Sequence, residues 1–196
     1  MAECGGLENR LTLYKSYEGS NPSSSARNRI ILSGFMGAGK TTVGKLLNEQ
    51  MRRGIAWLDL DEYIEEAYEQ KISDIFHQKG EQYFRDLEHE MLMFLLDLHP
   101  QIVVSAGGGT LIQDRNIQEL ATKDVTIIFL DVPFEVAYQR IKNESDNRAL
   151  ATSKTALREL YDKRYPVYME HCDYYISADA KPQEICDVLL SFIEEK

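Results

Sequence analysis

The amino-acid sequence predicts an α/β fold, a three-layer sandwich in which helices cover both faces of a parallel sheet. Two observations support this. Short runs of continuous apolar residues alternate along the chain with longer amphipathic stretches, which is typical of parallel strands buried on both faces. The first run leads directly into a glycine-rich loop, "GFMGAGKT" at 34–41, and then into an amphipathic helix. At 196 residues, the chain is expected to form one ordinary domain.

The predicted elements follow one another without an internal repeat or a second domain. We expect strands at 29–33, 55–60, 101–106, 125–131 and 173–177. We expect helices from Lys40 to about Arg53, from about Asp61 onward, and at 81–97, 114–122, 134–142, 153–170 and 182–195. Residues 1–28 stand apart, because they include "GSNPSSSARN" and have no sustained apolar period, and we expect them to form a flexible leader before a single domain at 29–196.

The composition restricts the partners that the chain can have. The formal charge is −10, from 32 acidic and 22 basic residues, which disfavours binding to a nucleic-acid backbone. No apolar run approaches the roughly 18–20 residues that cross a bilayer. The three cysteines include no C-x-x-C pair, and the four histidines show no ligand spacing. We therefore expect a protein of the reducing cytoplasm that has no disulfide framework, no zinc site and no membrane partner.

The loop at 34–41 spells G-x-x-x-x-G-K-[ST], the phosphate loop of nucleotide-binding proteins. Its glycines let backbone amides turn inward around a phosphate, and the following helix directs its N-terminal amides at the same anion. Lys40 can reach the β- and γ-phosphates, and Thr41 offers a hydroxyl to Mg²⁺. The expected ATP-binding residues of this loop are Gly37, Ala38, Gly39, Lys40, Thr41 and Thr42.

Two further motifs follow predicted strands. "DLD" places Asp59 and Asp61 at the end of the second strand, where one carboxylate can hold metal-bound water and the other can face a second ligand. Asp61 could instead be only a helix N-cap. "SAGGGT" at 105–110 ends the third strand, and its three consecutive glycines indicate either close backbone approach to a ligand or an unusual turn. Ligands of open α/β sheets bind at these carboxyl ends.

The same residues disfavour two classes of nucleotide-binding protein. A regulatory GTPase would carry N/T-K-x-D after an apolar strand, but "TKDV" at 122–125 has its aspartate one place too early. A motor or chaperone ATPase would usually be longer and would end its third strand in acidic residues, where this chain has "SAGGG". A small-molecule kinase remains.

The chain resembles shikimate kinases from Ile30 to its C-terminus. The resemblance depends on "SGFMGAGKTTVGKLL", "DLDEYIE", "ISDIFHQKGEQYFRDLE", "VVSAGGGT", "NRAL" and "LYDKRYPVY", in this order. It implies a five-stranded parallel sheet of order 2-3-1-4-5. It also implies transfer of the γ-phosphoryl group of ATP to the 3-hydroxyl of shikimate, a reaction of aromatic amino-acid biosynthesis, by a cytoplasmic monomer with one Mg²⁺ per subunit.

The resemblance also implies roles for individual residues. Thr41 and Asp59 would hold the metal, Arg148 would close a lid around 142–153 over the phosphates, and Lys181 and Pro182 would contact adenine. The implied catalytic residues are Lys40, Asp61 and Arg148. The implied shikimate contacts are Asp61, Arg85, Gly107, Gly108, Gly109 and Arg164.

Physical chemistry agrees with this acceptor set. An arginine grips a planar carboxylate through paired hydrogen bonds, and Glu88, three residues after Arg85, can hold its guanidinium in place. Phe76 and Phe84 could line the pocket or belong only to the core. The transition state of phosphoryl transfer is loose, so we rank Lys40, Mg²⁺ and Arg148 above Asp61 as sources of rate.

One motif departs from the family pattern. Many members have R-P-L-L in the lid where this chain has "RALA" at 148–151, and Ala149 in place of proline would leave the empty lid more mobile. Two alternatives remain at this point. The chain could phosphorylate another small hydroxy acid such as gluconate, which Arg85, Arg164 and "SAGGG" disfavour. It could also be an interaction module that has lost catalysis, which the intact motif residues disfavour.

Overall fold

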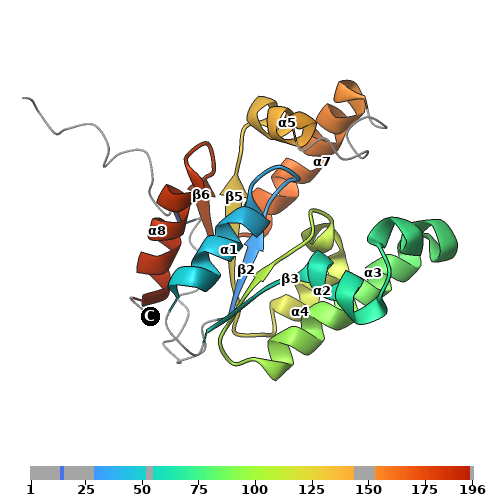
Figure 1. The fold of residues 1–196 in the computed structure, drawn as a ribbon, viewed down its shortest axis with the longest axis horizontal. Helices are drawn as coiled ribbons and strands as arrows, with labels where there is room; N and C mark the ends of the chain where they lie inside the picture. Colours follow the sequence, from blue (N-terminus) through green and yellow to red (C-terminus); the bar gives the residue numbers. More distant parts are fainter. Residues whose placement is uncertain (1–13, 16–28, 52–54, 144–152, 195–196) are drawn as a thin grey trace, which may run out of the picture.

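The computed structural model describes residues 14–15, 29–51, 55–143 and 153–194. Its strands form one sheet of order β1-β6-β5-β2-β4-β3 (Figure 1). The bounds are β1 Tyr14–Lys15, β2 Arg29–Ser33, β3 Ala56–Asp59, β4 Ile102–Ser105, β5 Thr126–Asp131 and β6 Tyr174–Ser177. From β2 onward every pair of neighbouring strands is parallel. Numbered by themselves in chain order, these five strands have the order 2-3-1-4-5, which confirms the predicted fold.

The sheet has a sixth strand that the sequence analysis did not include. β1 pairs antiparallel with β6, with Tyr14 opposite Tyr175 and Lys15 opposite Tyr174. This short strand lies inside the segment that we expected to be a leader. The rest of residues 1–28 lies outside the described residues, so the leader remains a prediction.

Helices lie on both sides of the sheet. Their bounds are α1 Lys40–Gln50, α2 Leu60–Tyr68, α3 Ile72–Leu98, the short 3₁₀ helix η1 Thr110–Ile112, α4 Asp114–Leu120, α5 Phe134–Asn143, α7 Lys154–His171 and α8 Pro182–Glu194. Figure 1 shows α1 beside α8, and α1 also contacts β3 and β4. α7 contacts β5 and η1. The strands between these layers are largely buried, as their continuous apolar runs predicted.

Helix α3 is longer than the sequence predicted. The expected helix at 81–97 is present, but a helical segment from Ile72 precedes it, and the two meet at Gly80, where φ is 84° and ψ is 169°. This glycine interrupts the apolar period, which is why the first segment was missed. Across the kink, the rings of Phe76 and Phe84 pack with their centroids 4.8 Å apart.

The carboxyl ends of the parallel strands lie at one edge of the sheet. Ser105 at the end of β4 is in register with Leu32 of β2 and with Asp59 of β3. The loops that leave these strands therefore start side by side, although they are far apart in the sequence. No helix in the described part of the chain is long and apolar enough to cross a membrane.

Candidate active site

The phosphate loop connects β2 to α1. Gly37 has φ 76°, and a Cβ atom on it would lie 2.8 Å from the carbonyl oxygen of Ala137 in α5, so both backbone angle and space require glycine there. Gly39, at φ 92°, is the N-cap of α1 and carries no side chain that could cap the first amides. The N-terminal end of α1 therefore faces the loop as an anion site.

Lys40 folds back onto the phosphate loop. Its ammonium donates hydrogen bonds to the carbonyl oxygens of Gly34 at 2.7 Å and Phe35 at 3.2 Å. Burial lowers the pKa of Lys40 to about 8, although Asp61 and Asp59 oppose this shift. The ammonium is thus held among backbone dipoles at the mouth of the loop.

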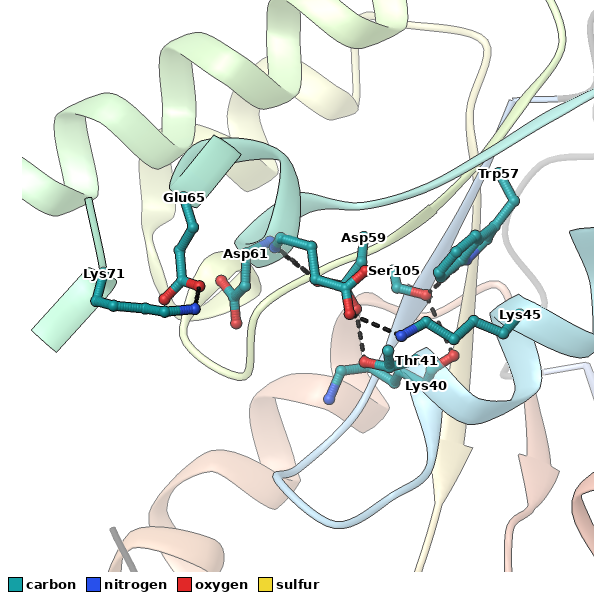
Figure 2. Close-up of polar contacts among 10 residues, drawn as sticks. Lys40, Thr41, Lys45, Trp57, Asp59, Asp61, Glu65, Lys71 and Ser105 are labelled. Carbon is teal, nitrogen blue, oxygen red and sulfur yellow. Dashed lines mark hydrogen bonds and ion pairs between the residues drawn. The ribbon is translucent and has the colours of Figure 1, made fainter. Parts of the chain in front are cut away.

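Thr41 and Asp59 meet at the start of α1. The Thr41 hydroxyl donates a 2.6 Å hydrogen bond to Oδ2 of Asp59, as Figure 2 shows. Oδ1 of Asp59 accepts hydrogen bonds from the backbone amides of Asp61 and Glu62, so Asp59 is the N-cap of α2. Asp61 lies in the first turn of α2 rather than on an extended strand, because the helix begins at Leu60.

This pair of oxygen ligands fits Mg²⁺, which prefers few protein oxygens and keeps several waters and phosphate oxygens. Asp59 is nearly buried, with 8% of its surface exposed, so its carboxylate is fixed by Thr41 and the helix cap. Among the described residues there is no group of three or more His, Cys, Asp or Glu side chains that could hold a metal alone. A cation at Thr41 and Asp59 would therefore need ligands from a nucleotide and water.

A partly buried hydrogen-bonded pair, Trp57 and Ser105, contacts the start of α1, and the sequence analysis missed it. The indole Nε1 of Trp57 donates to the Ser105 hydroxyl at 3.0 Å, and this hydroxyl donates to the Lys40 carbonyl oxygen at 3.2 Å (Figure 2). Gly44 leaves room for the indole, because a Cβ atom on Gly44 would lie 1.9 Å from Nε1. β3 and β4 therefore contact the first turn of α1 directly.

The second glycine loop lies beside the carboxylates of α2 and α3. A Cβ atom on Gly107 would lie 2.7 Å from Oε1 of Glu88 and 3.0 Å from Oδ1 of Asp61. This close approach brings Asp61 and Glu88 to the same stretch of backbone, and only a residue without a side chain fits between them. The sequence analysis inferred close approach to a ligand here, and the approach seen is to the protein's own side chains.

Arg85 lies against the same loop. A Cβ atom on Gly109 would lie 2.5 to 2.7 Å from its guanidinium atoms. Nη1 donates to Oε2 of Glu88 at 2.8 Å, and the guanidinium carbon lies 5.2 Å from the ring centroid of Phe84. Burial opposes the charge of Arg85, but Glu88 and Glu81 outweigh it and raise the pKa of Arg85. The guanidinium is thus held charged between two carboxylates.

Glu88 is a fully buried carboxylate, and a chain of hydrogen bonds leads from it away from the glycine loop. Its Oε1 accepts a 2.6 Å hydrogen bond from Thr110, whose carbonyl oxygen accepts one of 2.7 Å from Asn116. Oδ1 of Asn116 lies 2.6 Å from Nδ1 of His89. Because the Asn116 amide nitrogen donates to Thr110, this oxygen is the acceptor and His89 donates from Nδ1. The sequence analysis predicted the contact of Glu88 with Arg85 but not this extension.

Arg164 and Tyr168 of α7 complete the arrangement. A Cβ atom on Gly108 would lie 3.4 Å from Nη1 of Arg164, and the Tyr168 hydroxyl donates a 2.5 Å hydrogen bond to the Gly108 carbonyl oxygen. Burial raises the pKa of Tyr168 to about 12, so this hydroxyl keeps its proton at neutral pH. The same Cβ atom on Gly108 would lie 3.7 Å from the carbonyl oxygen of Gly34, which accepts a hydrogen bond from Lys40. The phosphate loop and the residues around Gly107–Gly109 therefore face one another.

The structure does not bring every predicted residue into the site. Arg148 and most of the expected lid lie outside the described residues. Lys181 is exposed, and its backbone amide donates to Glu184, while Pro182 begins α8. Arg140 donates to the carbonyl oxygens of Gly37 at 3.2 Å and Ala178 at 2.9 Å, so it connects the phosphate loop to the segment after β6.

Comparisons with known proteins agree with this geometry. Residues 36–194 match the sequence model of the family described as shikimate kinase. A shikimate kinase from Persephonella marina is 39% identical over 84% of this chain and 98% of its own, and one from Dictyoglomus turgidum is 37% identical over 86% and 96%.

Solved structures give the same result. The shikimate kinase of Acinetobacter baumannii in complex with shikimate has a TM-score of 0.76 at 31% identity, covering 87% of this chain and 94% of its own. The Aquifex aeolicus enzyme has a TM-score of 0.72 at 32% identity, covering 85% and 96%. A deoxyadenosine kinase of M. mycoides, at 16% identity, a TM-score of 0.57 and coverage of 86% and 100%, shows only a shared fold.

Proposed function

The chain belongs to the shikimate kinase family, and we propose from this premise how its residues carry out the reaction of that family. The enzyme transfers the γ-phosphoryl group of ATP to the 3-hydroxyl of shikimate and gives shikimate 3-phosphate and ADP, a step of aromatic amino-acid biosynthesis. The proposal assigns the donor half to the loop at 34–42 and the acceptor half to the residues around Gly107–Gly109. The observation that carries it is that Gly108 lies between the two halves: a Cβ atom on it would lie 3.4 Å from Nη1 of Arg164 and 3.7 Å from the carbonyl oxygen of Gly34, which accepts from Lys40.

In the donor half, Lys40 would leave the carbonyl oxygens of Gly34 and Phe35 and contact the β- and γ-phosphates. The amides of Gly37–Thr42 would bind the phosphate oxygens. Thr41 and Asp59 would hold Mg²⁺, which supplies neutralisation of phosphate charge when bound. This assignment is supported by their 2.6 Å contact at the N-terminus of α1.

In the acceptor half, Arg85 and Arg164 would hold the carboxylate of shikimate, which is its only charged group. The backbone of Gly107–Gly109 would lie against the ring, because side chains there would collide with Glu88 and Arg85. Asp61 would accept hydrogen bonds from hydroxyls and orient the 3-oxygen toward the γ-phosphorus. Phe84 and Phe76 lie against the Arg85 guanidinium, which is compatible with a wall of the pocket.

The transfer step forms a bond between the 3-oxygen and the γ-phosphorus. The bond from this phosphorus to the β–γ bridging oxygen breaks, and its electron pair leaves with ADP. The hydroxyl proton passes to the Asp61 carboxylate late in the step, because a loose transition state needs little help from a base. Charge neutralisation by Lys40, Arg148 and a bound Mg²⁺ would therefore supply more of the rate than Asp61, whose main role would be to orient the 3-oxygen.

The remaining assignments rest on the family resemblance. Arg148 would close over the phosphates from the lid around 142–153, and Lys181 and Pro182 would contact adenine. We also propose a cytoplasmic monomer without nucleic-acid or membrane partners. The acidic composition disfavours a nucleic-acid partner, and the described cysteines, Cys172 and Cys186, are buried thiols rather than disulfides, as expected in a reducing compartment.

The test is ADP release by the purified protein with ATP, Mg²⁺ and shikimate, and with gluconate in its place. Shikimate should stimulate ADP release well above the ATPase background, and gluconate should not. Arg85→Ala should raise the KM for shikimate strongly and leave nucleotide binding nearly intact. Absence of shikimate-stimulated ADP would overturn the proposal, and equal loss of both affinities in Arg85→Ala would overturn the assignment of Arg85.

A further inference from the structure

Arg85 is held by two carboxylates that differ in character. Glu88 is fully buried, and its Oε2 accepts from Nη1 of Arg85 at 2.8 Å. The Glu81 side chain is 69% exposed, and its single oxygen Oε1 accepts from Nε at 3.4 Å and from Nη2 at 3.3 Å. The contact with Glu88 is short and fixed by burial, whereas the contact with Glu81 is long and open to solvent.

The edge of the guanidinium that Glu81 covers is the one best suited to a ligand carboxylate. A carboxylate binds arginine most specifically through two parallel hydrogen bonds along one edge. Nη1 donates to Glu88, so Nε and Nη2 form the edge on which both donors are independent of Glu88. In this structure Glu81 accepts from both of these donors.

We propose that Glu81 is an intrinsic competitor of the substrate: it occupies the carboxylate-binding edge of Arg85 in the empty enzyme and must leave when the acceptor carboxylate binds. This inference rests on the proposed function, because it takes Arg85 as a carboxylate contact. Glu81 pairs with the Arg85 guanidinium before the acceptor binds. When the acceptor binds, its carboxylate replaces that of Glu81.

The local backbone makes this exchange feasible. Gly80, with φ 84°, ends the first segment of α3, so Glu81 stands at the start of a new helical segment rather than inside a turn. Its side chain is already largely in water, so releasing it desolvates nothing. Glu88 has neither property, because it is buried and also accepts from Thr110. Arg85 therefore keeps Glu88 as its anchor while Glu81 departs.

The direction in which Glu81 variants change the affinity for shikimate shows whether Glu81 competes with shikimate or supports Arg85. If Glu81 competes, Glu81→Gln and Glu81→Ala should lower both the KM for shikimate and its Kd in the absence of nucleotide. The decrease should be about two- to five-fold, the range expected for one exposed ion pair. The kcat and the KM for ATP should stay within about two-fold. Glu90→Gln, which removes an exposed carboxylate from the same helix, is the matched control and should change neither shikimate constant.

A rise in the shikimate KM of Glu81→Gln would overturn the inference, because it would make Glu81 a support for Arg85. No change would overturn it too. Thermal unfolding of each variant identifies any loss caused by weakening the start of the helical segment at Glu81. A lowered KM in a less stable variant would still support competition, because loss of structure cannot improve binding at the site.

Arg85→Ala separates failure of this inference from failure of the proposed function. If Arg85→Ala leaves the shikimate KM unchanged, the acceptor assignment itself is wrong. If Arg85→Ala raises this KM but Glu81→Gln does not lower it, only the competition is wrong. In the double variant the effect of Glu81→Gln should disappear, because the carboxylate has no guanidinium left to cover.

Discussion

The Tyr168 hydroxyl donates a 2.5 Å hydrogen bond to the carbonyl oxygen of Gly108, 60 residues earlier in the chain. This bond fixes helix α7 to the glycine loop after β4. Tyr168 lies one helical turn after Arg164 on this helix. Because Tyr168 also interacts with the Arg164 guanidinium, its bond to Gly108 helps to set the position of Arg164 relative to the loop.

Tyr168→Phe should raise the shikimate KM several-fold with little change in the KM for ATP. It removes the donor to Gly108 and should also lower the free energy of unfolding by about 1 kcal/mol. Steady-state kinetics and urea unfolding measure the two effects. Tyr161→Phe is a matched control, because Tyr161 lies on the same helix as Tyr168 and its hydroxyl also donates to a backbone carbonyl oxygen, that of Val132 after β5. It should cost similar stability and leave the shikimate KM unchanged.

Gly109→Ala should raise the shikimate KM by about ten-fold or more, because a Cβ atom there would lie 2.5 Å from Nη1 of Arg85 and must displace it. Gly108→Ala should have a smaller effect, since its Cβ atom would lie 3.4 Å from Arg164. Titration of both variants with shikimate at saturating ATP gives the ranking. The reverse ranking would show that Arg164, not Arg85, is the more sensitive contact.

Nucleotide binding should take up a proton at Lys40 above pH 8. Burial lowers the pKa of Lys40 from 10.5 to about 8 in the free protein, and phosphate oxygens favour the charged form, so binding raises this pKa again. Affinity for ADP should therefore fall as the pH rises from 8 toward 10. Calorimetry at pH 8.5 in two buffers of different ionisation enthalpy measures the proton. Lys40→Met should abolish the uptake, and Lys45→Met, on the exposed face of α1, should retain it.

The same shift has a consequence for the stability of the free protein. Between about pH 8 and pH 10.5 the unfolded chain keeps the proton that folded Lys40 has lost, so the unfolded state binds more protons. The contribution of Lys40 to the free energy of unfolding should then increase with pH across this window. Urea unfolding of the wild type and of Lys40→Met at pH 7.5 and 9.5 isolates this contribution. A difference independent of pH would show that Lys40 is charged throughout.

Thr41→Ala should raise the Mg²⁺ concentration needed for half-maximal activity by about ten-fold, whereas Thr41→Ser should stay near the wild type. The alanine removes the hydroxyl that lies 2.6 Å from Asp59, but Asp59 keeps its bonds to the first amides of α2. The fold should therefore remain intact. Activity titrated with Mg²⁺ after chelation of the metal measures the change, and an equal loss in Thr41→Ser would contradict a role for the hydroxyl.

The fold followed from local patterns because parallel strands buried on both faces have continuous apolar runs. Five predicted strands lie within about one residue of their observed bounds. The first segment of α3 and the β1 strand did not follow from such patterns. Gly80 breaks the apolar period in α3, and β1 depends on pairing with β6, a partner far away in the sequence.

Only part of the site geometry could be predicted. The phosphate loop is a continuous stretch whose spacing alone specifies its chemistry, and the contact between Arg85 and Glu88 follows from helical spacing. The hydrogen bonds of Trp57 to Ser105 and of Tyr168 to Gly108 join distant segments and leave no local signal. The role of Asp59 as the N-cap of α2 became visible only because the helix begins one residue earlier than expected.

Trp57 is the only tryptophan in the chain, and its indole is hydrogen-bonded through Ser105 to the first residue of the phosphate-loop helix. A shift of the first turn of α1 on nucleotide binding would change the hydrogen bonding of this one fluorophore. The protein therefore carries its own optical reporter of the donor half, and its emission can be followed in stopped flow without a label.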